Sequence, residues 1–566
     1  MEKKIELMCP AGSLPNLKAA VSQGADSVYF GLNKFGARAY AKNFNDNYFL
    51  ELINICKSND VKTYLTMNTL VKNQELKLFF KQLEFAYLNG LDAVIIQDPS
   101  FIEVIKRSFP GLKIHISTQA GIMNSLHANL FKNADRINLA RELSKEEIKE
   151  IRKNCKLELE MFVHGALCVS FSGSCLFSSF IGGRSGNRGR CAQPCRRKYG
   201  PDFFLSTKDL CLIRRIPEII KLGIDSLKIE GRMRTPYYVA ATTSVYRKAI
   251  DSYYQGKFEV TKEMVQKLND AFNREFTESF YSSEAVFNRI KSTGKESSSL
   301  EKYEVKVKRF NLLKRESKLL IPKINPEKSQ KKRLLVRVYS KEDALKAADA
   351  GADVIYFDLF DDNFIEVKNQ IKIPLYGITP RIFFDSDKEK LLKEIAEKKP
   401  EGLFVGSLGI LALNLKIPIH FDYNINCFND LNLQYLPGLP IISPELSLKE
   451  LAEFKNKNFA VLVHGKVRLM TMRHKLEKKE IKDEKNFVFK INKIHNGYEV
   501  LNEKELGLFN KCSDLLKNGI DNFFVDTDKN VDVIVRHYRN ILDGKSVDVS
   551  KLKKNYVLGW FFKGVE

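Results

Sequence analysis

Residues 19–30 read AAVSQGADSVYF, and residues 346–357 read KAADAGADVIYF, so the two stretches align without a gap. Each passes from a helix-like segment into a short apolar segment rich in β-branched and aromatic residues. That order is typical of a βα repeat, the building block of a parallel sheet. Because the same unit occurs in both halves of the chain, it predicts a duplicated α/β fold.

Eight short apolar segments alternate with amphipathic segments through the first 230 residues. Eight βα units that close on themselves make a TIM-type (β/α)8 barrel. One of the helical segments begins with Ser144 and Glu147 at the spacing of a capping box. The expected strands are residues 5–8, 27–30, 62–67, 93–97, 113–117, 136–139, 157–163 and 226–229.

Further matches between the halves keep their order along the chain. Val163-His164-Gly165 recurs at 463–465, Gly223-Ile224-Asp225 at 519–521, and Tyr246-Arg247 at 538–539. Chance similarity between unrelated βα units is the alternative to a duplication. We expect a first barrel with the catalytic site over residues 1–255, a linker with a small β element (strands 303–307 and 318–321) over 256–332, and a second, degenerate barrel over 333–566.

The composition bounds the class of protein. The chain has 566 residues, 44% hydrophobic and 28% charged, which excludes a disordered chain and a single small module. Its formal net charge of +23 favours a polyanionic partner such as RNA, although a solvated Lys-rich surface gives the same excess. The short apolar run before Pro10 does not fit a signal peptide, and no run is long enough to span a membrane. We therefore expect a soluble, cytoplasmic protein.

Four of the ten cysteines, Cys168, Cys175, Cys191 and Cys195, fall within a Gly- and Arg-rich loop that follows a predicted strand. In a reducing cytoplasm such a group indicates a metal site or catalysis before disulfides. The four thiolates can hold one zinc ion or one [4Fe-4S] cluster, and the absence of paired CxxC motifs favours the cluster. Four unrelated thiols are the other interpretation. Cys9 and Cys211 are alternative ligands, whereas the remaining cysteines are expected to be ordinary apolar residues: Cys56, Cys155, Cys427 and Cys512.

Polar residues are predicted to gather where the strands of the first barrel end, because TIM barrels carry their chemistry there. His164 is a candidate proton donor or acceptor, although its recurrence as His464 in a repeat without the cysteines favours a structural role. Glu230 and Gln119 are further catalytic candidates. Candidates for binding a small carboxylate substrate are Asn68, Arg141, Arg232 and Arg234, and an internal salt bridge of Glu230 with Arg232 and Arg234 is the alternative. Candidates for binding RNA phosphates are Arg184, Arg188, Arg190, Arg196 and Arg197, for which a solvated loop is the alternative.

Several motifs together resemble those of the collagenase-like peptidases, family thirty-two of the peptidases of unknown catalytic type. Residues 160–178 read EMFVHGALCVSFSGSCLFS and match the family signature, except that Phe177 replaces a smaller aliphatic residue. The other matches are ELMCPAG (6–12), HISTQ (115–119), LKIEGRMR (227–234) and the closing GWFFKGVE (559–566).

The resemblance implies an iron–sulfur protein in spite of the protease label. Better-understood members resemble oxygen-independent hydroxylases of tRNA or rRNA bases, several of which use prephenate as the oxygen donor. The four cysteines match the pattern that binds the [4Fe-4S] cluster, with Cys195 the least certain. Whether a separate partner protein is needed is left open by the sequence. The alternatives are a peptidase, for which the sequence offers no HExxH motif, and a non-catalytic RNA-binding protein with a structural cluster. The second barrel, which lacks the cysteines, is expected to serve substrate docking, packing or RNA binding.

Overall fold

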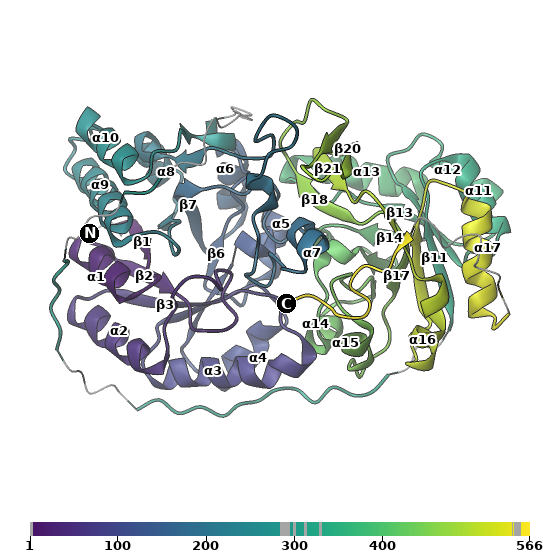
Figure 1. Ribbon diagram of the computed structural model, residues 1–566, viewed down its shortest axis with the longest axis horizontal. Helices are drawn as coiled ribbons and strands as arrows, with labels where there is room; N and C mark the ends of the chain where they lie inside the picture. The colour runs from purple at the N-terminus through teal and green to yellow at the C-terminus, as the bar shows by residue number, and fades with distance from the viewer. Residues whose placement is uncertain are drawn as a thin grey trace. The chain divides into compact units, whose positions relative to one another are not determined.

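The computed structural model describes residues 4–282, 295–297, 302–308, 310, 314–327, 331–545, 547 and 556–566. The chain forms two units, shown in Figure 1, and each is described by itself. The first comprises Met1–Val71, Glu75–Gly173 and Gly186–Ile321; the second comprises Lys72–Gln74, Ser174–Ser185 and Pro322–Glu566. One difference from the expected domains lies inside the cysteine loop, because Ser174–Ser185 belongs to the second unit.

Eight parallel strands of the first unit close into a barrel, as predicted. They pair in chain order, and β9 closes the ring by pairing with both β1 and β7. Three expected strands have the predicted bounds, and the others differ by a few residues at their ends. The strands are β1 (Glu6–Pro10), β2 (Ser27–Phe30), β3 (Lys62–Met67), β4 (Ala93–Ile96), β5 (Lys113–Ile116), β6 (Arg136–Asn138), β7 (Glu158–Ala166) and β9 (Ser226–Ile229).

Helices cover the outside of this barrel (Figure 1). The capping box predicted at Ser144 and Glu147 is present at the start of α6, where each residue bonds the backbone of the other. None of the helices in the described ranges is long and apolar enough to cross a membrane. The longer helices are α1 (Leu14–Ser22), α2 (Asp46–Ser58), α3 (Leu76–Leu88), α4 (Phe101–Ser108), α6 (Lys145–Asn154), α9 (Pro236–Tyr254) and α10 (Lys262–Ala271).

The inside of the first barrel holds a network of buried charges. Arg136 Nη1 lies 2.6 Å from Glu6 Oε1 and 3.5 Å from Glu160 Oε2, and Lys228 Nζ lies 2.7 Å from Glu160 Oε1. Burial alone would raise the pKa of Glu6, but its bonds to Arg136 and Tyr64 lower it to about 2. Because each buried charge has an opposite partner, the network fixes the strands relative to one another and is costly to break.

The second unit repeats this architecture. Eight parallel strands follow the same order, and an isolated bridge between Ile441 and Ala460 joins the ends of the curled sheet. This confirms the predicted second, degenerate barrel. The strands are β11 (Arg333–Arg337), β12 (Val354–Asp358), β13 (Leu375–Ile378), β14 (Gly402–Val405), β15 (Ile419–Phe421), β16 (Leu439–Pro440), β17 (Val461–Gly465) and β23 (Asn522–Asp526).

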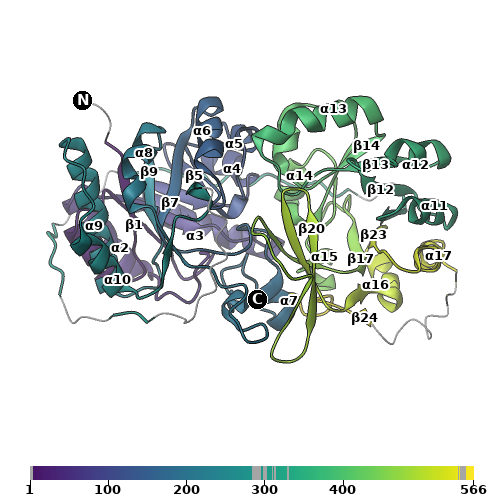
Figure 2. The ribbon, with the colours of Figure 1, turned by 90° about the horizontal axis from the view of Figure 1, so that it is seen from above.

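A small antiparallel sheet stands in the second unit where the first has its cysteine loop. Its strands pair in the order β18-β21-β20-β19, and the chain enters them directly after β17. Figures 1 and 2 show it beside the barrel of its own unit. Its strands are β18 (Arg468–Met472), β19 (Glu480–Lys482), β20 (Val488–Ile494) and β21 (Gly497–Leu501).

The repeated motifs occupy equivalent places in the two units. Tyr246, on α9, donates a hydrogen bond to the carbonyl of Val163 at 2.8 Å, and Tyr538, on α17 (Val531–Leu542), donates one to Val463 at the same distance. Each unit also adds an antiparallel strand to the outside of its seventh barrel strand. These are β8 (Asp209–Cys211) on β7 and β22 (Glu505–Gly507) on β17.

The prediction of a small β element in the linker is wrong. Residues 303–307 and 318–321 are described, and neither segment is a strand. The linker instead bonds the helices of the first unit: Asn59 donates to the carbonyl of Lys306, and the backbone of Leu320 donates to Ser108. These side chains at helix ends form hydrogen bonds with backbone groups of the linker, which would otherwise pair with a neighbouring strand. Much of the Ser/Lys/Glu-rich stretch 291–302 lies outside the described residues. The first unit also extends past residue 255, through α10 and β10 (Phe276–Thr277).

The equivalence of the two units predicts equal responses to one change. Tyr246→Phe and Tyr538→Phe each remove one buried hydroxyl and leave a carbonyl with one bond fewer. We expect each variant to lose about 1 kcal/mol of unfolding free energy from its own unit. Differential scanning calorimetry measures both. A loss from one variant alone would contradict the equivalence.

Candidate functional site

The carboxyl end of β9 carries the residue around which the mouth of the first barrel is arranged. Glu230 follows β9 directly; its Oε1 lies 3.3 Å from Arg38 and its Oε2 lies 3.3 Å from Arg141. Burial acts to raise the pKa of Glu230, but Arg38 and Arg141, followed by Arg232 and Lys228, outweigh burial and hold it below its ordinary value. Glu230 is therefore an anion at neutral pH that fixes two cations.

Two of the four predicted ligand cysteines, Cys168 and Cys191, lie near enough to Arg38 for their charge to act on it. Glu230, and after it Cys168 and Cys191, hold the pKa of Arg38 above its usual range. Burial raises the pKa of Cys195 to about 12, and its neighbours Cys168 and Cys191 act in the same direction. Residues from the loops after β2 and β7 thus meet beside the carboxylate at the end of β9.

Cys175 lies on the part of the loop that belongs to the second unit. It forms an isolated bridge with Met470, the backbone of Leu176 donates to the carbonyl of Leu469 at 2.7 Å, and Thr471 donates to Ser174. The short helix α7 (Phe177–Gly182) follows. Within the described ranges, no three His, Cys, Asp or Glu side chains are gathered closely enough to hold a metal ion.

The loop cysteines are more exposed than the cysteines that were expected to be ordinary apolar residues. Cys168 is exposed, and Cys175, Cys191 and Cys195 are half-buried; none of them forms a disulfide. Cys9 is fully buried under α9, where Thr243 donates to its sulfur. Cys211, at the end of β8, lies beside Tyr246 of α9. The expected ordinary cysteines are all buried: Cys56, Cys155, Cys427 and Cys512. All four loop cysteines are free thiols, the donor type that an iron–sulfur cluster requires.

Gly173 fixes the path of the chain between Cys168 and Cys175. It has a positive φ of 84°, and a Cβ there would lie 2.2 Å from the carbonyl oxygen of Gln119. Gln119 follows β5 in a short 3-10 turn, and the same carbonyl accepts a bond from Gln97. The backbone carbonyl of Gln119 therefore packs against the cysteine loop at Gly173, in addition to any role of its side chain.

The other predicted binding residues of the mouth are committed to protein partners. Asn68 accepts from the backbone of Ala37 and donates to Ser117. Arg232 is buried and donates to Thr66 and Asn43, and burial lowers its pKa to about 10. Arg234 stacks 3.6 Å from the ring centre of Phe272 and pairs with Asp209 at 3.6 Å.

The five arginines of the cysteine loop differ in their surroundings. Arg188 forms a forked pair with Glu75, and Arg196 bonds the carbonyls of Thr207 and Leu167, so both brace the loop. Arg190 and Arg197 are exposed and Arg184 is half-buried. The exposed pair has the accessibility that the predicted contact with RNA phosphates requires.

His164 lies in a buried aromatic cage. The ring centres of Tyr246 and Phe276 lie 5.5 and 5.4 Å from its own, and burial lowers its pKa to about 3. His464 has the same environment around Tyr538, with its pKa also lowered to about 3 by burial. A neutral imidazole repeated in a unit without the cysteines favours the structural role.

Arg38 is the residue of this site that the sequence analysis missed. The polar residues considered at strand ends began with the third strand, whereas Arg38 lies in the long loop after β2. Extending the same rule to the second strand would have included that loop. Its side chain is 30% exposed and lies near both Glu230 and the thiols. Of the two arginines that pair with Glu230, Arg38 is more exposed than Arg141.

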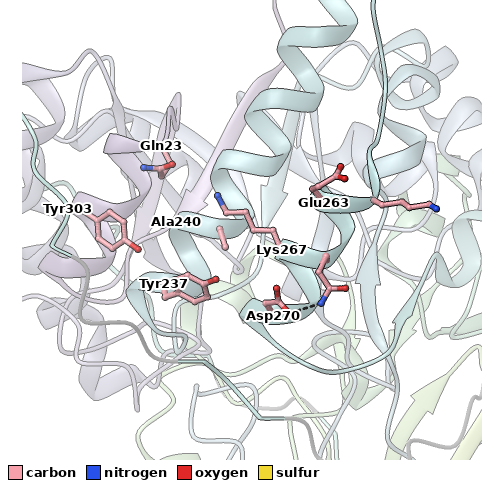
Figure 3. Close-up of a pocket in the computed structure, with 10 residues that line it drawn as sticks. Gln23, Tyr237, Ala240, Glu263, Lys267, Asp270 and Tyr303 are labelled. Carbon is pink, nitrogen blue, oxygen red and sulfur yellow. Dashed lines mark hydrogen bonds between the residues drawn. The ribbon is translucent and has the colours of Figure 1, made fainter.

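Another cavity of the first unit lies away from these residues. It has a volume of about 630 Å3 and opens between α9, α10 and the linker residue Tyr303. Figure 3 shows Lys267 and Glu263 on its wall, with Tyr237 and Asp270 below them. None of the predicted site residues lines it.

The fold and the site define a class: a βα-barrel protein with a thiol-bearing loop at the carboxyl ends of its strands. The model of peptidase family U32 matches residues 12–291. An uncharacterized protease of Methanocaldococcus jannaschii is 42% identical over 299 residues, covering 49% of this chain and 73% of that protein. The chain belongs to peptidase family U32.

Two further relatives carry RNA in their names. The tRNA hydroxylation protein P1 of Bacillus subtilis is 39% identical over 303 residues, covering 49% of this chain and 71% of that protein. The 23S rRNA 5-hydroxycytidine C2501 synthase of Escherichia coli is 33% identical over 272 residues, covering 46% of this chain and 41% of that protein.

The close approach at Gly173 predicts an effect specific to that glycine. Gly173→Ala places a methyl group against the Gln119 carbonyl in a backbone conformation that alanine rarely adopts. We expect a loss of about 1–3 kcal/mol of unfolding free energy. Gly182→Ala is the matched control, because nothing lies within 4 Å of its added methyl group. Equal melting temperatures for the two variants would contradict the packing described.

The charge state of Glu230 predicts a pH dependence. Because its pKa is lower in the folded protein, its stabilising contribution is fully present above its unfolded pKa of about 4.3 and is lost as pH falls through the folded value. Glu230→Gln should lower the unfolding free energy by about 3 kcal/mol at neutral pH, and the difference should shrink in acid. Urea unfolding at several pH values measures it, with Glu259→Gln on the surface as control. A difference independent of pH would contradict the ion pairing.

Proposed function

We propose that this chain hydroxylates an RNA base without molecular oxygen, using the mouth of the first barrel. The observation that carries the proposal is the position of Arg38, which pairs with Glu230 at the end where TIM barrels hold their substrates and is close enough to Cys168 and Cys191 to feel their charge. The relatives named as tRNA and rRNA hydroxylation proteins support the choice of substrate.

The loop thiols would hold a [4Fe-4S] cluster, through Cys168, Cys175, Cys191 and Cys195. When bound, such a cluster supplies one-electron chemistry that amino-acid side chains lack. Gly173 sets the course of the loop, and Arg188 and Arg196 hold it to the barrel. These contacts fix the course of the loop by protein groups alone.

Arg38 and Arg141 would bind the carboxylate of a small oxygen donor, for which prephenate is the candidate. Both guanidinium groups already face Glu230, so the site is built for a carboxylate beside cations. Glu230 keeps the two arginines in place and is available as an anion to orient a hydroxyl group of the donor. Arg232 acts from behind through Thr66 and Asn43 and is a positioning residue.

RNA would approach over the exposed Arg190 and Arg197. Contacts between arginine and phosphate position a strand without reading its sequence, so the choice of base must come from the barrel mouth. A peptidase is the alternative that the protease name of one relative favours. Thiols that hold a cluster cannot also act as nucleophiles, so the two functions make opposite demands on Cys168.

Loss of one modified nucleoside tests the proposal. In a strain that lacks the gene, mass spectrometry of digested total RNA should show one hydroxylated nucleoside missing. The unaltered gene and a Cys155→Ala variant, changed at a buried thiol away from the loop, should restore it, whereas Cys168→Ala should leave it more than tenfold reduced. An unchanged nucleoside profile in the deletion strain would overturn the proposal. Proteolysis that survives Cys168→Ala would favour the peptidase.

A further inference from the structure

The second barrel contains a cavity of its own at the corresponding end. Its volume is about 710 Å3, and it opens at the carboxyl ends of the barrel strands, with one wall formed by β19, β20 and β21. Arg337 ends β11 and Asp358 ends β12, and both line it. A barrel mouth of this size is where the TIM fold binds small molecules.

The floor of this cavity is a cluster of buried ion pairs. Arg468 bonds Asp526 and Glu499, and Arg381 bonds Asp422 at 2.8 Å. Arg468 stands three residues after Gly465, as Cys168 stands three after Gly165, so a guanidinium replaces the first thiol. These ion pairs join residues from several strands of the second unit and are costly to break.

Tyr339 presents an open aromatic ring above this floor. Its hydroxyl donates to Asp526 Oδ1 at 2.6 Å and accepts from Arg468 at 2.7 Å, while the residue is 48% exposed. The two bonds hold the ring in one orientation. A fixed aromatic face next to solvent is a platform on which a planar ring can stack.

Arg337 places a guanidinium beside that ring, where its charge also acts on the buried Asp526. Its guanidinium carbon lies 5.3 Å from the centre of the Tyr339 ring, and its buried Nε has no hydrogen-bond partner among the described residues. Lys490 and Lys493, exposed on β20, add positive charge to the wall. Phosphate oxygens fit a guanidinium fork supported by lysines.

Acidic side chains line the same cavity and favour a ligand that also has hydrogen-bond donors. Asp358 and Glu480 both line it and are exposed. Their carboxylates repel a ligand that is anionic throughout, but they accept hydrogen bonds from hydroxyl or amino groups. The lining therefore suits a molecule with one anionic group, a planar ring and several donors.

We propose that the mouth of the second barrel binds a nucleoside 5′-phosphate, either as a free nucleotide or as one residue of an RNA strand. The phosphate lies on Arg337 and Lys490, the base stacks on Tyr339, and the ribose hydroxyls bond the carboxylates. The site uses none of the cysteines and so does not depend on the function proposed for the first barrel.

Calorimetric titration of the full-length chain tests this site. The probes are the four ribonucleoside 5′-monophosphates, ribose 5-phosphate, uridine and a uridine tetranucleotide. We expect at least one nucleotide to bind more tightly than the probes that lack its base or its phosphate. A tetranucleotide that binds when the monophosphates do not would identify RNA as the source. No saturable binding of any nucleotide or of the tetranucleotide would overturn the proposal.

Variants locate the binding. Arg337→Gln should weaken the affinity roughly tenfold, because it removes a charge-assisted contact. Lys490→Gln, a surface change on β20, should weaken it by a smaller factor, while Arg536→Gln, at an exposed arginine of α17 outside the cavity, should leave it unchanged. Cys168→Ala should also bind normally, which separates this test from that of the first barrel. Equal affinities for Arg337→Gln and Arg536→Gln would contradict the site.

Discussion

The ion pairs of Glu230 with Arg38 and Arg141 are the constraint on which the mouth of the first barrel depends. Three loops that are far apart in the sequence, after β2, β6 and β9, are drawn to one point by this carboxylate. A buried carboxylate is tolerated only when cations offset the loss of its water, and the lowered pKa of Glu230 shows that they do. Arg38 then extends the same electrostatic environment to the thiols of the loop after β7.

The second barrel has a similar carboxylate, which pairs with an arginine from a different position. Asp526 ends β23 as Glu230 follows β9, and it too holds a guanidinium, but that guanidinium belongs to Arg468 at the position of Cys168. The glycine of each Val-His-Gly motif packs against the carbonyl of its acidic residue, Glu230 or Asp526. Duplication thus preserved the frame of the mouth, while the loop chemistry diverged from thiols to a closed ion-pair cluster.

Sequence patterns predicted the parts of this protein that depend on local periodicity. The eight strands of the first barrel, the repeat and the capping box at Ser144 follow from spacing within short segments, and all are confirmed. What the sequence could not supply was the choice of partner between distant segments. Arg38, Arg141 and Arg232 look alike in sequence, yet only the fold decides that the last donates to Thr66 and Asn43 while the first lies beside the thiols. The linker failed for the same reason, since its β-like residues bond helix ends of the first unit.

The central claim is that the loop thiols form a cofactor site at the barrel mouth, and its most direct measurement is the iron and acid-labile sulfide content of the anaerobically purified chain. We expect a brown protein with close to four irons and four sulfides for each chain. Cys168→Ala and Cys191→Ala should lose most of both, while Cys155→Ala and Cys211→Ala retain them. A colourless chain with stoichiometric zinc, or iron that is unaffected by Cys168→Ala, would contradict it.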